Sequence, residues 1–522
     1  MSAISTRTLP VVTVLGIAAV AGLIVLLTWA AVLSPQYILV SWLAVGGLAA
    51  LVWYSVRGDL LTAVLIWFVT LIALHEEWWR VPVPYFFALT IPRIGIVVVA
   101  ILLVLMVLLG RIRLRMAWPV SGAILALLTY FFISAVVSGF ETRSIVSVHY
   151  RLIGGYVFPF MVFVLVLHGF RTERDFRRLA LFFAGIGAYL TFTGWCEHLG
   201  LRSLVFPRFI NDPSVGIHWG RVRGPFVMSA GMGLALTFCF YSNLLLARGI
   251  ARGRRLIYLL NALSLPVIFW TKTRSVWLGF VLGAVVWIAY SRRRMTRIVA
   301  VSGLVCLALL VAVINMDNFM GTERAKGGLT DMEPILMRVG LAQLTWEIFK
   351  VHPVFGVGFG HFRDFAPDFA RDPSSAAFAF GATALEHNNL LSILGETGLV
   401  GVFLYTLTIF MLLRGSVQLY RKLSPTGAGF INRDLLVLYW ILTVIYFVDG
   451  SFRETSDNPF ANSLFFGLSA VPVALNYLLG PAPLHARPGW APQARGPGGG
   501  SAPDGVVRSS SPLRPTSRRD GG

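Results

Sequence analysis

A histidine between a carboxylate and an amide marks the start of a long apolar run. Glu386, His387 and Asn388 lie just before residues 390–413, a stretch long enough to cross a bilayer. Polar side chains at a membrane boundary are costly unless they face a cavity or a partner. The pattern therefore predicts titratable chemistry at the mouth of a transmembrane bundle.

A second group of residues supplies positive charge on the same predicted side. Lys272 and Arg274 occupy a very short connection between two apolar spans, and Arg221 and Arg223 close an earlier loop. A cation is retained there only if something anionic offsets its cost, either a structural carboxylate or an anionic substrate. Arginine binds phosphate as a bidentate fork, and histidine exchanges protons near neutral pH. Together they suit a reaction on a phosphate-linked substrate.

The elements that position these residues are predicted to be membrane helices. Of the 522 residues, 56% are hydrophobic and only 13% charged, about half the charge of a soluble protein. Lipid cannot satisfy an open backbone, so the fold class is all-α, a polytopic bundle of about 12–14 spans. The candidate spans are 10–33, 37–56, 60–74, 86–110, 117–138, 150–168, 178–196, 226–247, 256–271, 274–290, 298–315, 389–413, 433–448 and 460–480.

The positions of Lys and Arg predict the orientation of the bundle. Clusters follow the fourth, sixth, eighth, tenth and twelfth spans, and all fall on one side if the spans alternate. That side, with both termini, is predicted to be cytoplasmic. The formal net charge of +20 is then mostly a topology signal. No nucleic-acid-binding module accompanies it.

Four regions follow from this reading. Residues 1–315 form a transmembrane bundle of about eleven spans, and residues 316–388 a long extracytoplasmic loop. Residues 389–480 add C-terminal transmembrane helices. Residues 481–522, rich in Pro, Gly, Ser and Arg, are predicted to be a disordered cytoplasmic tail.

The long loop is predicted to be partly helical and to carry function. Apolar residues recur at helical spacing through residues 334–351, around Arg338, until His352 and Pro353 end the helix. A glycine-rich turn follows at residues 356–360. We expect the loop to act as a lid over the site. The three cysteines have no paired spacing, so neither a disulfide, a metal centre nor a cofactor is predicted.

From about Arg221 to Leu413 the chain resembles the O-antigen ligase and polymerase superfamily of bacterial membrane proteins. The order and spacing of four pieces carry the resemblance. The first piece is Arg221 to Phe226, and the second is Thr273-Arg274-Ser275. The third combines Arg338, Trp346, His352-Pro353 and Gly356-Val357-Gly358. The fourth combines Glu386-His387-Asn388 with Glu396 to Gly401. Members often have Pro-Asn shortly after the first piece, where this chain has Val227 and Met228. Whether Arg221 or Arg223 matches the family arginine is open, and the spacing favours Arg221.

The resemblance implies a metal-independent glycosyl transfer at the outer face of the cytoplasmic membrane. The donor would be a glycan on undecaprenyl diphosphate, and the acceptor a lipid A-core sugar, another lipid-linked repeat unit or a protein hydroxyl. Arg274 and Arg221 would stabilise the leaving diphosphate. His387 would act as base or orienting group for the acceptor. Arg223, Arg338, Lys272, Glu386 and Asn388 would contact the diphosphate or glycan.

Alternative interpretations remain for the activity and for single residues. A repeat-unit polymerase or a protein-directed transferase would use the same donor and differ in the acceptor. A transporter of an anionic substrate would need inverted repeats and broken helices near the midplane, and neither is visible. His387 and Asn388 also suit a helix N-cap, Glu386 suits a helix N-terminus, and Arg338 suits a solvated helix face.

Overall fold

The computed structural model confirms an all-α polytopic membrane protein. It describes residues 38–74, 79–81, 88–144, 146–250, 252–290, 333–372, 378–379, 388–423, 430–456 and 458–479. His387, Glu386, the predicted spans 10–33 and 298–315, and the predicted tail lie outside the described residues. The total number of spans therefore stays a prediction.

The described helices fall close to the predicted spans. In the first half they are α2 (Ile38–Arg57), α3 (Leu60–Ala73), α4 (Ile91–Leu108), α5 (Val120–Ser138), the π-helix η2 (Tyr150–Val157), α6 (Phe158–Gly169) and α7 (Glu173–His198). In the second half they are α8 (Ser229–Gly249), α9 (Arg254–Trp270), α10 (Arg274–Tyr290), α13 (Glu333–Val351), α14 (Phe362–Phe369), α16 (Asn389–Lys422), α17 (Arg433–Gly450) and α18 (Pro459–Leu479). A two-stranded antiparallel pair, β1 (Arg80–Val81) and β2 (Leu89–Thr90), precedes α4.

Length and composition make several of these helices fit to cross a membrane. Among the described residues, seven helices are long and apolar enough to do so. Their outward faces carry large apolar side chains, such as Val104 on α4, Phe132 on α5 and Phe403 on α16. Such exposure suits hydrocarbon and is unusual for a water-soluble fold.

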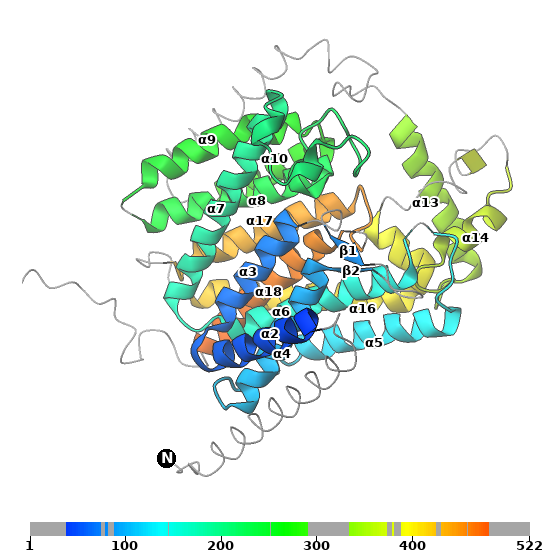
Figure 1. Ribbon diagram of the computed structural model, residues 1–522. Helices are drawn as coiled ribbons and strands as arrows, with labels where there is room; N and C mark the ends of the chain where they lie inside the picture. The colour runs from blue at the N-terminus through cyan, green and yellow to red at the C-terminus, as the bar shows by residue number, and fades with distance from the viewer. Residues whose placement is uncertain are drawn as a thin grey trace, which may run out of the picture. The chain divides into compact units, whose positions relative to one another are not determined.

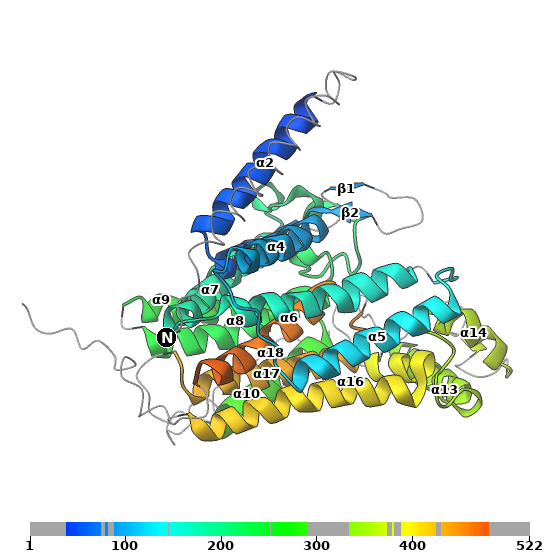
Figure 2. The same ribbon diagram turned by 90° about the horizontal axis from the view of Figure 1, so that it is seen from below.

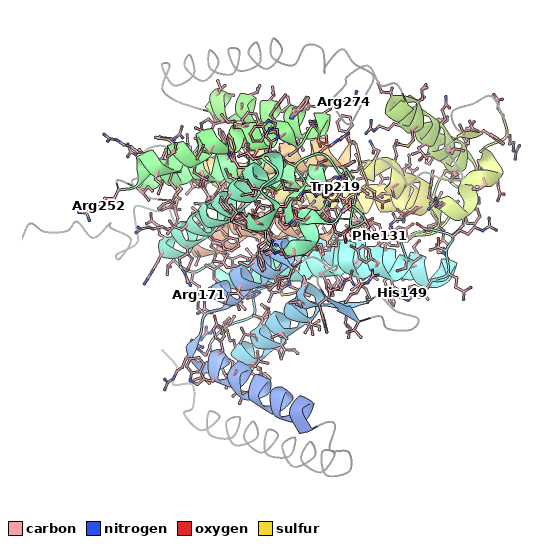
Figure 3. All side chains as sticks on the ribbon, turned by 45° about the horizontal axis from the view of Figure 1, so that its top comes forward. Phe131, His149, Arg171, Trp219, Arg252 and Arg274 are labelled. Atoms are coloured by element: carbon pink, nitrogen blue, oxygen red, sulfur yellow. The ribbon has the colours of Figure 1, made fainter. Side chains whose placement is uncertain are left out.

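One end of the bundle gathers the described arginine clusters, which lie at or after the ends of α4, α6, α8 and α16. At this arginine-rich end the Arg111 side chain donates to Ser55 O, the Arg171 side chain donates to Arg111 O at 3.4 Å, and Arg248 pairs with Asp434 at 2.6 Å. Figure 3 shows Arg171 and Arg252 on one side of the bundle, and Arg274 and Trp219 on the other. The structure thus separates the two groups of cations along the helices.

The opposite end, here named the loop end, is where α7, α9 and α17 finish and α8, α10, α16 and α18 begin. There α13 and α14 pack against the first turns of α16, and α16 runs beside α5 (Figures 1 and 2, yellow and cyan). The predicted loop helix at residues 334–351 is α13. The helix α14 was not predicted, because its eight residues include Pro367 and several charges.

The helix α16 is broken near its start by a glycine. Gly398 has φ 63° and ψ −160°, a backbone region that only glycine enters readily. The turn after α13 fills the break, because Leu399 N donates to Pro353 O at 2.9 Å and Val400 N to Val354 O at 3.2 Å. A Cβ on Gly398 would lie 2.3 Å from Val354 O. The break thus docks the long loop onto the membrane helices.

Substituting Gly398 is therefore expected to destabilise the protein. Gly398→Ala adds backbone strain and a clash with Val354, a loss of roughly 1–3 kcal/mol. Gly415→Ala is the matched control on the same helix, where an added Cβ meets nothing within 4 Å and should stabilise by about 0.5–1 kcal/mol. Thermal unfolding in detergent measures both. Equal melting temperatures for Gly398→Ala and wild type would contradict the close approach.

Candidate functional site

Three of the predicted cations meet at the turn between α9 and α10. Lys272 has φ 47°, in the left-handed region, and its carbonyl accepts a hydrogen bond from Arg221 Nη1 at 3.2 Å. Arg274 begins α10 two residues later. All three side chains are half-buried. Burial and the neighbouring Arg221 guanidinium lower the pKa of Lys272. The turn therefore concentrates positive charge at the loop end (Figure 3).

A histidine that the sequence analysis did not single out lies beside this turn. Ser229 Oγ is 3.0 Å from His218 Nδ1 and 3.0 Å from Thr273 Oγ1. His218 has φ 65°, which is uncommon outside glycine. Its position three residues before Arg221 was the available sequence signal. His218 is thus a second titratable group near the cationic turn, hydrogen-bonded to the first residue of α8.

Arg223 has contacts of a different kind from those of Arg221. Its side chain is buried and donates to the carbonyls of Ile210, Asp212 and Val215. Its guanidinium also lies 4.5 Å from the centre of the Trp219 ring. These contacts hold the loop before α8 in shape. They favour Arg221 as the arginine available to a substrate.

Arg338 and Asn388 line a common cavity of about 250 Å³ between α13 and α16. The Arg338 guanidinium lies 5.2 Å from the centre of the Phe452 ring. The predicted capping role of Asn388 is confirmed, because its Oδ1 accepts from Leu390 N and Leu391 N, each at 3.0 Å. Asn388 directly follows His387, the predicted base, in the sequence. The cavity is therefore lined by the first described residue after His387.

A buried ion cluster lies behind this cavity. Arg151 on η2 forms a two-point pair with Glu396 on α16, with distances of 2.5 and 3.0 Å, and also pairs with Glu454. Ser392 and Ser456 accept further hydrogen bonds from the same guanidinium, each at 3.1 Å. Glu396 was predicted only as part of a motif, and Arg151 was not predicted. A lone arginine at the start of an apolar span was the available signal.

Hydrogen bonds extend from this cluster across the core. Asn389 accepts from Thr455 Oγ1 at 2.8 Å and donates to Tyr405 Oη at 3.1 Å. Tyr405 meets Tyr446 at 3.1 Å, and Tyr446 donates to Asn462 at 2.8 Å. Buried polar groups in such a network specify one arrangement, because each unmade bond is costly. The network fixes the start of α16 next to His387.

Residues 451–456, which we name the connector, link the two groups of predicted site residues. Ser451 O accepts from Asn388 Nδ2 at 3.4 Å, and Phe452 faces Arg338. Arg453 pairs with Asp449 and approaches Met228 Sδ at 3.3 Å, one residue before Ser229. The connector therefore spans from the Arg338 cavity to the segment that carries His218 and the cationic turn. Within the described ranges, no group of three His, Cys, Asp or Glu has the arrangement of a metal site.

Comparison with known proteins identifies one part of the chain. The family model described as O-antigen ligase matches residues 259–406. No curated protein matches the chain. The matched region contains Lys272, Arg274, Arg338 and the start of α16, and it begins after Arg221. The resemblance predicted from the motifs is thereby confirmed, and residues 259–406 of this multi-pass membrane protein match the O-antigen ligase family.

Proposed function

We propose that the chain is a glycosyltransferase that moves a glycan from undecaprenyl diphosphate to an acceptor hydroxyl. The observation that carries the proposal is the meeting of Arg221, Lys272 and Arg274 in one half-buried turn. The loop end faces the outside of the cytoplasmic membrane, and both termini are cytoplasmic. This orientation follows from the arginines gathered at the other end.

The reaction places its developing charge where the turn can stabilise it. The bond between the anomeric carbon and the diphosphate oxygen breaks, and the acceptor oxygen bonds to that carbon. The electron pair stays on the diphosphate, so its negative charge grows in the transition state. Arg221 and Arg274, with Lys272, neutralise that charge without rearranging, which is the most effective electrostatic use of fixed cations.

The acceptor proton passes to a base. His387 is our candidate, with Glu386 orienting it, and Asn388 and Arg338 lining the adjoining cavity for the glycan. The buried cluster around Arg151 keeps the start of α16 rigid, so that the base is held in position. Arg223 is assigned to shaping the loop rather than to binding the donor.

The acceptor separates a ligase from a repeat-unit polymerase, and glycan profiling of a deletion strain distinguishes them. In a ligase mutant, long polymer accumulates on its lipid carrier. In a polymerase mutant, single repeat units accumulate. An unchanged profile of lipid-linked, lipid A-linked and exported glycans in the deletion strain contradicts the proposed function.

Arg274→Ala is expected to fail to complement the deletion, because one leaving-group contact is lost. Removing a donor of this kind lowers the rate by about 10²–10³-fold. Arg252→Ala is the matched control, an exposed arginine at the arginine-rich end, and should restore the wild-type profile. Equal expression of both variants is verified by immunoblot. Full complementation by Arg274→Ala would remove Arg274 from the site.

The lowered pKa of Lys272 predicts an alkaline limit on donor binding. A lysine is charged below its pKa, so the stabilising charge is present at neutral pH and lost as pH rises through the lowered value. Lys272→Arg keeps the charge and should move the rise in donor KM to higher pH. Lys350→Arg, an exposed position on α13, serves as control. Identical alkaline profiles for Lys272→Arg and wild type would refute this role.

The pH dependence of the rate distinguishes the roles of His387 and His218. His387→Ala should slow transfer by about 10²–10⁴-fold and abolish the fall in rate at acid pH. His218→Ala should retain that fall, since we assign His218 no proton transfer. The reverse result would make His218 the base.

A further inference from the structure

A second cavity lies at the loop end, apart from the cavity that Arg338 and Asn388 line. It has a volume of about 180 Å³ and is lined by residues of α3, β2, α4, η2, α6, α18 and the short 3₁₀ turn η5 (Gly224–Phe226). No role in the reaction proposed above uses this cavity.

Two buried polar side chains in the cavity wall have unused hydrogen-bonding capacity. Asn458 and Ser463 are 8% and 1% exposed. Asn458 Oδ1 caps α18 by accepting from Ala461 N at 3.3 Å. Asn458 Nδ2 and Ser463 Oγ have no hydrogen-bond partner among the residues that the structure describes. An unpaired buried polar atom costs about 1–3 kcal/mol, so these atoms indicate a polar occupant.

The remaining wall combines aromatic rings with aliphatic residues and with the polar side chains of Thr90 and Arg93. Trp67, Tyr150, Phe226 and Phe460 line it, and the Trp67 ring is held by a 2.8 Å hydrogen bond from Nε1 to Pro92 O. Phe226 and Phe460 pack with ring centres 4.7 Å apart. Flat apolar faces beside a few placed polar groups are typical of a site for a small molecule that is apolar on its faces and polar at its edges. A sugar ring has this character.

The cavity also adjoins the connector. Met228 lines it and contacts Arg453 of the connector. On the other side, Asn458 N donates to Thr455 O at 3.0 Å, and Thr455 donates to Asn389. A sugar held here would therefore lie between the segment that leads to the cationic turn and the start of α16.

We propose that this cavity binds a sugar ring of one of the two reacting glycans. Asn458 Nδ2 and Ser463 Oγ hydrogen-bond its hydroxyls, and the aromatic rings pack on its faces. Neither a lipid tail nor an apolar filling would satisfy the two polar atoms. The proposal deepens the proposed function and rests on it for the identity of the sugar, but sugar binding itself can be tested separately.

Two substitutions each remove one of the two polar donors, and Ser463→Ala does so without adding a charge. Ser463→Ala deletes a buried hydroxyl without a described partner, so it should not reduce stability. Asn458→Asp keeps the capping oxygen of α18 and removes the Nδ2 donor. Thr237→Val on α8 is the matched control, because Thr237 Oγ1 is likewise buried without a partner in the described ranges and does not line the cavity.

Saturation-transfer NMR on the full chain in deuterated-lipid nanodiscs tests binding. The probes are free glucose, galactose, N-acetylglucosamine and N-acetylgalactosamine, with empty nanodiscs as blank. Wild type, Thr237→Val and Arg274→Ala should saturate at least one sugar, and Ser463→Ala and Asn458→Asp should bind it about tenfold more weakly. No saturation in wild type, or equal binding by the two cavity variants, overturns the proposal. Co-purified lipid lost only from the cavity variants in native mass spectrometry also overturns it.

The transfer assay then distinguishes the source of the sugar. A rise of about tenfold in acceptor KM for Ser463→Ala assigns the cavity to the acceptor, and the same rise in donor KM assigns it to the donor. Unchanged values of both overturn a role in the reaction. Sugar binding without any transfer in wild type would refute the proposed function and leave the binding site standing.

Discussion

The pairing of Arg151 with Glu396 and Glu454 is the interaction on which the loop end depends. It joins the π-helix η2, the start of α16 and the connector, all within a buried region. Removing one member of a buried ion pair leaves an uncompensated charge, which is strongly destabilising. The cluster therefore forces three distant parts of the chain to meet. Gly155 contributes by letting η2 approach Ser456 closely.

The break of α16 at Gly398 complements this cluster. Backbone groups released by the break are taken up by the turn at residues 353–358, with Gly358 N donating to Glu396 O at 2.8 Å. In a membrane, irregular backbone persists only where protein satisfies its polar groups. The glycine-rich turn at residues 356–360 and the motif from Glu396 to Gly401 thus contact each other. That contact anchors the long loop to the first part of α16.

The cations at the two ends of the bundle have different contacts. Arginines at one end pair with carboxylates and backbone carbonyls, as Arg248 does with Asp434. At the loop end Arg221, Lys272 and Arg274 share a turn despite their mutual repulsion. A bound anion offsets this repulsion, because it attracts all three cations at once. A diphosphate leaving group is such an anion, and the proposed reaction uses it.

The sequence by itself determined the helical class, nearly all described helix positions and the resemblance of residues 259–406 to the O-antigen ligase family. Hydrophobic length is local, and lipid permits little besides helices, so α5 and α10 follow directly from their residues. Motif spacing likewise pointed to Arg274 and Asn388. The tertiary structure alone decided that Arg223 shapes a loop while Arg221 faces the turn, that His218 adjoins Ser229, and that Arg151 meets Glu396. These contacts join residues far apart in the chain, and a one-dimensional pattern carries no record of which distant polar groups satisfy one another once buried.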